Sequence, residues 1–333
     1  MLLSIITCLE RVNGYRDRGD TPLQVAVRKK DVDLVKSLIT NGNDVKATND
    51  IEETALMIAA SDGSAKMIEL LLSYSDVKAT DQYGETALML AAWSGNEKSV
   101  ELLIPKSDVK ATNNVGYTAL MIAAMNGNEK SLQLLLPDSD VKATNKNGYT
   151  ALMYAARLGN EKSPCLELLV PKSDVKATNK YGETALMFAA RNENEKSVEL
   201  LLPMSDANAT NYAGNTALMF AARNGNEKSL ELLFPYSDVK ATNNQGNTAL
   251  MFAARNENEK SLELLIPYFD VKATNNYGET ALMYAAESGK EKSVELLLPK
   301  SDVKATNNGG KTALDIAKMY RYDQIVSLFQ QQN

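Results

Sequence analysis

Gly116-Tyr117-Thr118-Ala119-Leu120-Met121 contains the pattern that decides the fold, because its core, Thr-x-Leu, recurs along nearly the whole chain. Successive threonines of this core are mostly 32 residues apart, with one interval of 33 and one of 34. They are Thr21, Thr54, Thr86, Thr118, Thr150, Thr184, Thr216, Thr248, Thr280 and Thr312. Self-similarity at such a period is typical of stacked supersecondary units, so we expect a repeat array rather than one closed core.

The unit at residues 113–144 illustrates the local structure that we expect in each repeat. Thr118 stands where a side-chain oxygen can accept a backbone N–H at a helix start, which predicts a short helix over 119–125. Gly127 is suited to the left-handed conformation that ends such a helix. Asn128 can then cap a second helix. Each unit is therefore predicted to be a helix-turn-helix.

The first full unit carries a resemblance to a known family. It begins Gly19-Asp20-Thr21-Pro22-Leu23, and two apolar helical runs follow. This resembles the ankyrin repeat, whose first helix begins with Thr-Pro-Leu-His. Ten tandem matches cover residues 19 to about 330. The resemblance implies an all-α, ankyrin-type solenoid of about ten helix-turn-helix repeats with β-turn or hairpin fingers.

The two ends of the array differ from its middle. Residues 1–18 lack the Thr-x-Leu core but place apolar side chains at helical spacing, so we expect a capping helix or partial repeat there. Residues 19–306 are predicted to form nine ankyrin repeats. Residues 307–333 carry the polar groups expected of a C-terminal capping repeat. We expect these parts to form one continuous solenoid.

Two apolar columns are expected to fill the core. Methionine replaces the family's histidine in eight units, and we expect its thioether to pack between stacked helices in place of the lost polar bond. These are Met57, Met89, Met121, Met153, Met187, Met219, Met251 and Met283. The aromatic residues before an Ala-Ala pair turn inward at helical spacing and are expected to be buried. They are Tyr154, Phe188, Phe220, Phe252 and Tyr284.

Other departures from the repeat predict local strain or local adjustment. The fifth unit has two extra residues, so Ser163 is expected to cap a second helix that begins at Pro164. Glu52, Glu193 and Glu257 occupy slots where other units have glycine. A positive φ at these positions would make each a soft point of the array.

Charge and cysteine content exclude several classes of protein. The net charge is −6 and the pI is near 5.1, which argues against binding to nucleic acid or to an anionic membrane. No stretch approaches the roughly 18 apolar residues of a membrane span, and the run from Met1 to Leu9 lacks the basic start of a signal peptide. Cys8 and Cys165 are the only cysteines, so we expect no disulfide framework and a reducing, cytoplasmic location.

Residues that could carry catalysis are missing or scattered. The chain has no histidine, which excludes Ser-His-Asp and Cys-His catalysis and histidine metal ligands. The carboxylates recur in columns with the repeat, where turn hydrogen bonds are the ordinary role. Cys165 has no basic neighbour and is expected to be a structural core residue. We therefore expect no enzymatic activity, no cofactor and no metal.

The residues that change from unit to unit occupy a small set of surface slots. In ankyrin-like proteins the turn tips and the exposed end of the first helix line a concave groove, which the resemblance assigns to partner binding. Arg, Tyr and Trp are the side chains that most often dominate interface energetics. We therefore expect a partner to contact Tyr83, Trp93, Tyr117, Met125, Tyr149, Arg157, Tyr181, Arg191, Arg223, Arg255 and Tyr277.

The function predicted from these observations is non-enzymatic protein-protein interaction by a monomer. Four of the arginines follow one another in successive units, and we expect them to grip an acidic segment of the partner. They are equally consistent with a solvated ladder that was copied with the repeat. The alternative function is a structural scaffold or elastic spacer without one tight partner, which the near-identity of the units favours.

Overall fold

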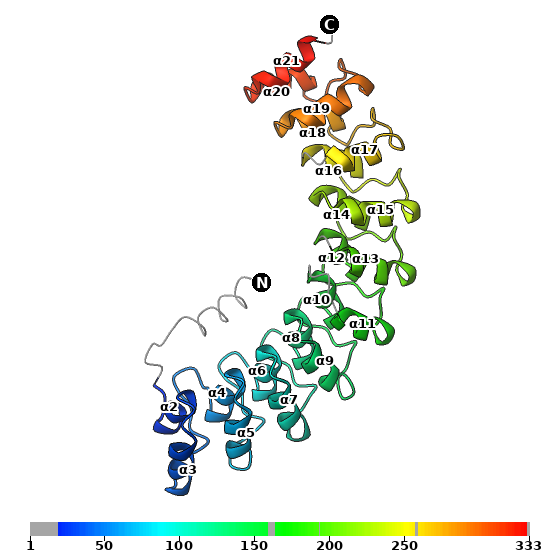
Figure 1. Cartoon of the computed structure of the whole chain (residues 1–333). Coiled ribbons are helices and arrows are strands. Elements are labelled where there is room, and N and C mark those ends of the chain that lie inside the picture. The colour runs from blue at the N-terminus through cyan, green and yellow to red at the C-terminus, as the bar shows by residue number, and fades with distance from the viewer. Residues whose placement is uncertain (1–18, 159–163, 193, 257–258, 332–333) are drawn as a thin grey trace. The chain divides into compact units, whose positions relative to one another are not determined.

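The computed structural model describes residues 19–158, 164–192, 194–256 and 259–331 (Figure 1). These residues form paired helices and no strands, and their one bridge pairs Thr48 with Thr54. The predicted all-α repeat fold is confirmed, with fingers that are turns. The capping segment expected over residues 1–18 lies outside the described residues, as do Ser163, Glu193 and Glu257.

Ten helix pairs make up the described array. The first helices of the pairs are α2 (Pro22–Arg28), α4 (Ala55–Ser61), α6 (Ala87–Ser94), α8 (Ala119–Asn126), α10 (Ala151–Arg157), α12 (Ala185–Arg191), α14 (Ala217–Asn224), α16 (Ala249–Arg255), α18 (Ala281–Glu287) and α20 (Ala313–Met319). The second helices are α3 (Val32–Thr40), α5 (Ala65–Leu71), α7 (Glu97–Leu103), α9 (Glu129–Leu135), α11 (Pro164–Leu169), α13 (Glu195–Leu201), α15 (Glu227–Leu233), α17 (Glu259–Leu265), α19 (Glu291–Leu297) and α21 (Asp323–Gln331).

Short 3-10 turns extend five of the second helices, and each contains the proline that stops the α-helix. These turns are η1 (Ile104–Lys106), η2 (Val170–Lys172), η3 (Leu202–Met204), η4 (Phe234–Tyr236) and η5 (Leu298–Lys300).

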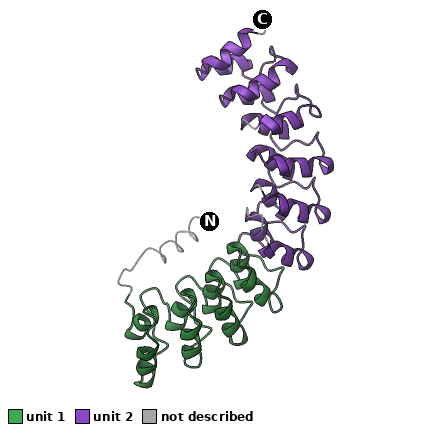
Figure 2. Ribbon diagram, in the orientation of Figure 1, with its two compact units in different colours: residues 1–145 green, residues 146–333 purple. Residues whose placement is uncertain are grey.

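Two compact units divide the chain, residues 1–145 and residues 146–333 (Figure 2). The first unit contains α2 to α9 and the second contains α10 to α21. Within each unit, successive first helices pack against one another, as α4 does against α6 and α14 does against α16. A single continuous solenoid over the whole chain stays a prediction.

The repeated threonine begins each first helix as predicted. Thr118 Oγ1 accepts the backbone N–H of Met121 at 3.3 Å, and the helix that follows is buried along most of its length. Gly127 ends it in the left-handed conformation, with φ of 69°. Because Thr-x-Leu occurs in all ten units, the same helix start recurs through the array.

The predicted capping role of Asn128 is wrong. Its side chain makes no capping hydrogen bond to α9. Instead, the side-chain amide donates to the carbonyls of Ala92 at 2.8 Å and Trp93 at 3.1 Å, in the preceding repeat. Asn226 reaches back in the same way to the carbonyl of Ala190. At Asn128 and Asn226 this slot therefore joins neighbouring repeats, whereas Asn96 in the same slot caps its helix by accepting the Ser99 N–H at 2.9 Å.

Both predicted core columns are buried. The eight methionines are at most 2% exposed, and the five aromatic residues before the Ala-Ala pairs are at most 9% exposed. The methionine sulfur also keeps a polar contact, because the Met57 sulfur accepts the Thr54 N–H at 3.4 Å. The same contact occurs in the repeats of Met187 and Met251. As expected, the buried methionine side chains pack where the family has a histidine. The thioether sulfur adds a weak hydrogen bond at the helix start.

In the fifth repeat the described part of the second helix, α11, runs from Pro164 to Leu169. The residues directly before it lie outside the described residues, so the predicted start of this helix at Pro164, capped by Ser163, stays a prediction. Cys165 follows Pro164 and is 1% exposed. Its predicted role as a core residue is confirmed.

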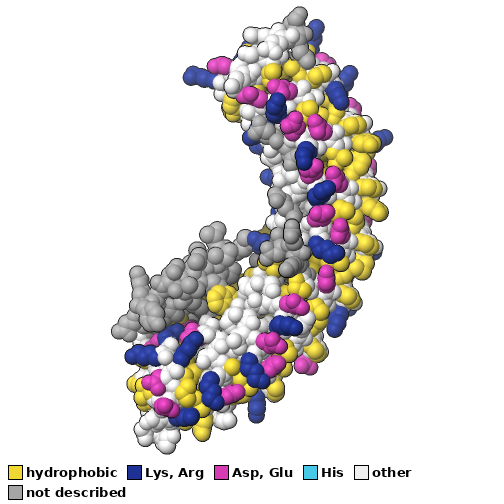
Figure 3. Space-filling model, viewed as in Figure 1, with side chains coloured by type: hydrophobic (Ala, Val, Ile, Leu, Met, Phe, Trp, Pro, Cys, Tyr) yellow, Lys and Arg dark blue, Asp and Glu magenta, His cyan; other side chains and the backbone are white. Residues whose placement is uncertain are grey.

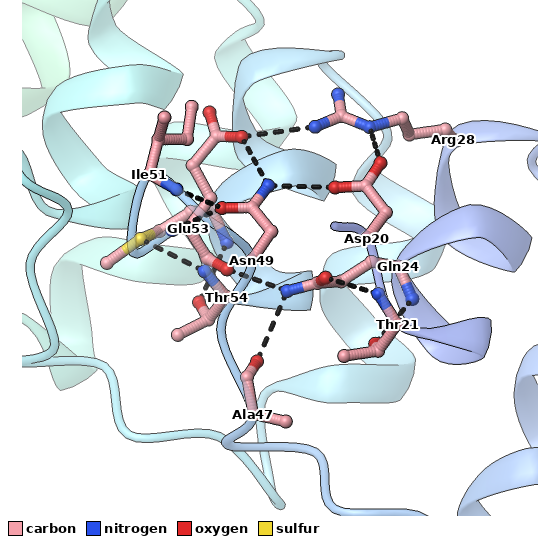
Figure 4. Close-up of polar contacts among 10 residues, drawn as sticks. Asp20, Thr21, Gln24, Arg28, Ala47, Asn49, Ile51, Glu53 and Thr54 are labelled. Atoms are coloured by element: carbon pink, nitrogen blue, oxygen red, sulfur yellow. Dashed lines mark hydrogen bonds and ion pairs between the residues drawn. The ribbon is translucent and has the colours of Figure 1, made fainter. Parts of the chain in front are cut away.

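The first repeat keeps a polar residue, Gln24, in the slot that later becomes methionine (Figure 4). The Gln24 amide donates to the carbonyls of Ala47 at 3.2 Å and Glu53 at 2.6 Å, and its Oε1 accepts the Thr21 N–H at 2.8 Å. Gln24 is fully buried, so these bonds satisfy groups that would otherwise be costly to bury. This side chain therefore ties the first repeat to the second.

Gln24→Met should loosen the first repeat, because methionine cannot donate to the carbonyls of the second repeat. A net hydrogen bond contributes about 1 kcal/mol, so amide hydrogen exchange in α2 should accelerate by roughly fivefold. Gln133→Met is the matched control, since among the described residues the Gln133 amide donates to Glu129 of its own helix and to no other repeat. Equal exchange in the Gln24 variant and the wild type would contradict the tie.

Glu52 is held in the left-handed region, with φ of 64°. Gly84 and Gly116 fill the same slot in the next two repeats, with φ of 75° and 86°. The soft point predicted at Glu52 is therefore present in the backbone, because an L residue pays a steric penalty that glycine avoids.

Glu52→Gly should raise the free energy of unfolding by about 1 kcal/mol, as measured by urea denaturation. Glu52→Ala removes the carboxylate but keeps the Cβ atom, so it should leave the stability near the wild-type value. If the alanine variant were stabilised as much as the glycine variant, the side-chain charge rather than the backbone would be the cause.

Candidate partner-binding surface

In eight of the ten described repeats, one Asn or Asp side chain holds the finger tip. In the sixth repeat Asn179 Oδ1 accepts the backbone N–H groups of Tyr181 and Glu183, both at 2.9 Å. Gly182 lies between these two residues with φ of 74°. The turn thus fixes the tip residue and the residue before the capping Thr184. The Oδ1 atoms that make the same turn elsewhere belong to Asn49, Asp81, Asn113, Asn211, Asn243, Asn275 and Asn307.

Backbone hydrogen bonds join neighbouring finger tips in the second unit. The Tyr212 N–H donates to the Tyr181 carbonyl, and the Asn244 N–H donates to the Ala213 carbonyl, both at 3.0 Å. The tips of successive repeats are therefore held at a fixed spacing. The variable slots form rows on this framework.

The most regular row consists of Arg157, Arg191, Arg223 and Arg255, here called the arginine row, and all four lie in the second unit. Three of these guanidinium groups lie over an aromatic ring of the next repeat, in the geometry of a cation-π contact. The distances to the ring centroids are 4.1 Å for Arg191 over Phe220, 5.8 Å for Arg223 over Phe252 and 5.8 Å for Arg255 over Tyr284.

The charges of the arginine row are not equally available. Arg191 donates to the Glu183 carboxylate, eight residues earlier. The corresponding residues for Arg223 and Arg255 are Asn215 and Asn247, which carry no charge. Both of these arginines are exposed, and the described part of the chain provides neither of them with an ion pair. The residue before the capping threonine therefore decides whether an arginine is paired internally.

The other residues predicted from the sequence fall into two groups. Tyr83, Trp93, Tyr117 and Met125 belong to the first unit, and each is half-buried. In the second unit Tyr181 and Tyr277 are exposed by 56% and 55%. The predicted residues are therefore divided between the two units, and each group is described within its own unit.

Tyr149 is more firmly packed than its place beside a turn predicts. Its ring lies 5.4 Å from the rings of both Tyr154 and Phe188. Burial and the nearby Glu183 carboxylate raise the pKa of Tyr149, while Arg157 acts in the opposite direction. Tyr149 is thus close to the charge of Glu183, in the slot before the capping threonine, and to the charge of Arg157, in the arginine row.

Sequence reasoning missed Tyr212, which lines a surface pocket together with Tyr149, Tyr181 and Glu183. In the other internal repeats the slot of Tyr212 holds a polar residue, such as Lys180. In the later repeats it holds asparagine. A single aromatic residue in a slot that is otherwise polar was the available signal.

The charges on the surface are mixed. On the face drawn in Figure 3, basic and acidic side chains are interspersed, and neither sign forms a continuous area. Several charged side chains of the described residues are paired with one another, as Lys228 is with Glu231 at 2.9 Å. Among the described residues, no three Cys, Asp or Glu side chains gather in a way that could hold a metal ion. None of the described helices is long and apolar enough to cross a membrane.

Comparison with known proteins identifies the repeat. No curated protein matches the chain. A family model described as ankyrin repeats in three copies matches overlapping stretches that extend from residue 23 to the end of the chain. The matched residues are 23–113, 99–163, 120–211, 158–243, 198–275, 232–307 and 269–333. The chain therefore belongs to the ankyrin-repeat family, as the resemblance in its sequence predicted.

Proposed function

We propose that the chain binds a partner protein without covalent chemistry, through the arginine row and the tyrosine slots beside it. Ankyrin repeats are generally protein-protein interaction modules and are typically non-enzymatic. The variable slots of this chain are displayed on a framework of repeated turns, which is the arrangement that such recognition requires. We further propose that it acts as a monomer and that it is cytoplasmic, because its two cysteines lead us to expect a reducing compartment.

The observation that carries this proposal is the state of Arg223 and Arg255. Each guanidinium lies over the ring of the next repeat and has no carboxylate partner among the described residues. A cation-π contact at this distance leaves the N–H donors of the guanidinium open to a partner. Two such positive charges on adjacent repeats favour a partner with an acidic segment.

Replacing both arginines by methionine should weaken partner binding by about tenfold or more, in the range of interface hot spots. Methionine is the residue that the array itself uses in this slot at Met125, so the long apolar stem over the ring is retained. The partner is first captured from native extract on the immobilised chain. Its affinity for the Arg223→Met/Arg255→Met variant is then measured at low and high salt, where the salt dependence should flatten.

The matched control is Lys240→Ala/Lys272→Ala, which removes the same charge from exposed loops of the same two repeats. It should bind like the wild type. If the control and the arginine variant lose affinity equally, the effect is one of net charge, and the arginine row is not the site. The absence of any stoichiometric partner would instead favour the alternative function, a structural spacer.

A further inference from the structure

Three tyrosines from successive repeats surround one pocket in the second unit. Tyr149, Tyr181 and Tyr212 line it, together with Glu183, Asn211 and Ala213. The pocket has a volume of about 570 Å³ and is open to solvent, which is enough room for a side chain of another protein. The repeats that contribute the tyrosines are the fifth, sixth and seventh.

The pocket has one rigid wall and two accessible ones. Tyr149 is fixed by its ring contacts with Tyr154 and Phe188, whereas Tyr181 and Tyr212 are 56% and 73% exposed. The Tyr212 ring lies close to Gly182, since a Cβ atom at Gly182 would come within 2.8 Å of it. This glycine therefore allows the ring to lie across the finger of the preceding repeat.

The groups that line the pocket attract positive charge. Aromatic faces are negative, and a cation over a tyrosine ring gains about 0.5 to 2 kcal/mol. Glu183 is the one charged residue of the lining. Its carboxylate is buried and already accepts hydrogen bonds from Arg191 and Asn179, so a bound cation would share it with Arg191. Arg191 itself is not part of the lining. The amide oxygen of Asn211 is already used by its finger turn, so the rings and the carboxylate define the recognition chemistry.

We propose that the pocket formed by Tyr149, Tyr181, Tyr212 and Glu183, here called the tyrosine pocket, binds a lysine or arginine side chain of the partner protein. This inference rests on the proposed function, that the chain binds a protein. It adds a site for a positive charge of the partner to the site proposed for its acidic segment. The pocket lies in the fifth to seventh repeats, and Arg223 and Arg255 lie in the seventh and eighth. A partner segment with a basic residue beside an acidic stretch would match both, and only in one direction.

A titration with a small probe tests the pocket directly. Full-length chain with isotope-labelled tyrosine rings is titrated with a blocked Gly-Lys-Gly tripeptide and with the same tripeptide carrying norleucine, which has no charge. The lysine probe should shift the resonances of Tyr149, Tyr181 and Tyr212, with an affinity at least about threefold higher than that of the norleucine probe. Equal binding of the two probes would identify an apolar pocket, and no shift with lysine would remove the site.

Two variants borrow residues that the array already uses. Tyr212→Asn introduces the residue found at Asn244, and it should reduce the affinity for the lysine probe several-fold without changing the melting temperature. Tyr236→Asn is the matched control, because Tyr236 is an exposed tyrosine of the same unit outside the lining. Loss of binding in both variants, or in neither, would overturn the assignment.

The role of the carboxylate needs a variant that leaves Arg191 without an unpaired charge. Glu183→Asn/Arg191→Met removes both members of the ion pair, and asparagine is the residue of the equivalent slot at Asn215. The lysine probe should bind this variant more weakly than the wild type. Unchanged affinity would show that the carboxylate takes no part and would contradict a cation site.

Failure of this inference is distinguishable from failure of the proposed function. The tripeptide has no acidic residue, so its binding does not depend on Arg223 and Arg255. If it gives no shift while the arginine variant still loses the partner, the tyrosine pocket is wrong and the arginine row stands. The converse result would retain a cation pocket and reject the acidic segment.

Discussion

The face that varies between repeats depends on one hydrogen-bonded turn, in which a single Asn or Asp side-chain oxygen accepts two backbone N–H groups. Backbone N–H groups near the core must find acceptors. This one oxygen accepts both N–H groups, as Asn179 Oδ1 does in the sixth repeat. Both of these bonds come from backbone N–H groups of the tip residue and of the residue before the threonine, so they require no particular side chain there, although the Asn179 amide also donates to the Glu183 carboxylate. Those two slots can therefore change from repeat to repeat while the helices that follow them stay the same.

The arginines join this variable face to the invariant core. Arg223 lies over Phe252, which is itself a core residue of the next repeat. The two interpretations of the arginine row, a solvated ladder and a binding row, share this contact between the guanidinium and the ring. What differs is the slot eight residues earlier, where Glu183 neutralises Arg191 and Asn215 leaves Arg223 unpaired. A single carboxylate thereby changes the charge that a repeat offers to a partner.

Much of this fold is readable from the sequence because it is local. Thr118 and Gly127 act within one helix, so their residue types and spacing are sufficient to predict their roles. The function of Asn128 was wrongly predicted because its acceptors lie 35 and 36 residues away, in another repeat. The pocket at Tyr212 was not predicted for the same reason, because its lining comes from successive repeats. The pairing of Arg191 with Glu183 lies within one repeat and depends on where the finger turn places Glu183 relative to the end of α12, which periodicity alone does not specify.

The methionine column has a consequence for the chemistry of the folded chain. Its eight sulfur atoms are shielded by neighbouring repeats, with each methionine at most 2% exposed, so an oxidant reaches them only when a repeat opens. Oxidation converts a flexible apolar side chain into a polar sulfoxide that does not fit such a core. A repeat that had opened and been oxidised could not close again as before. In this column a transient local opening can therefore leave a covalent modification, a methionine sulfoxide, that persists after the opening. A histidine in the same slot would not form a sulfoxide.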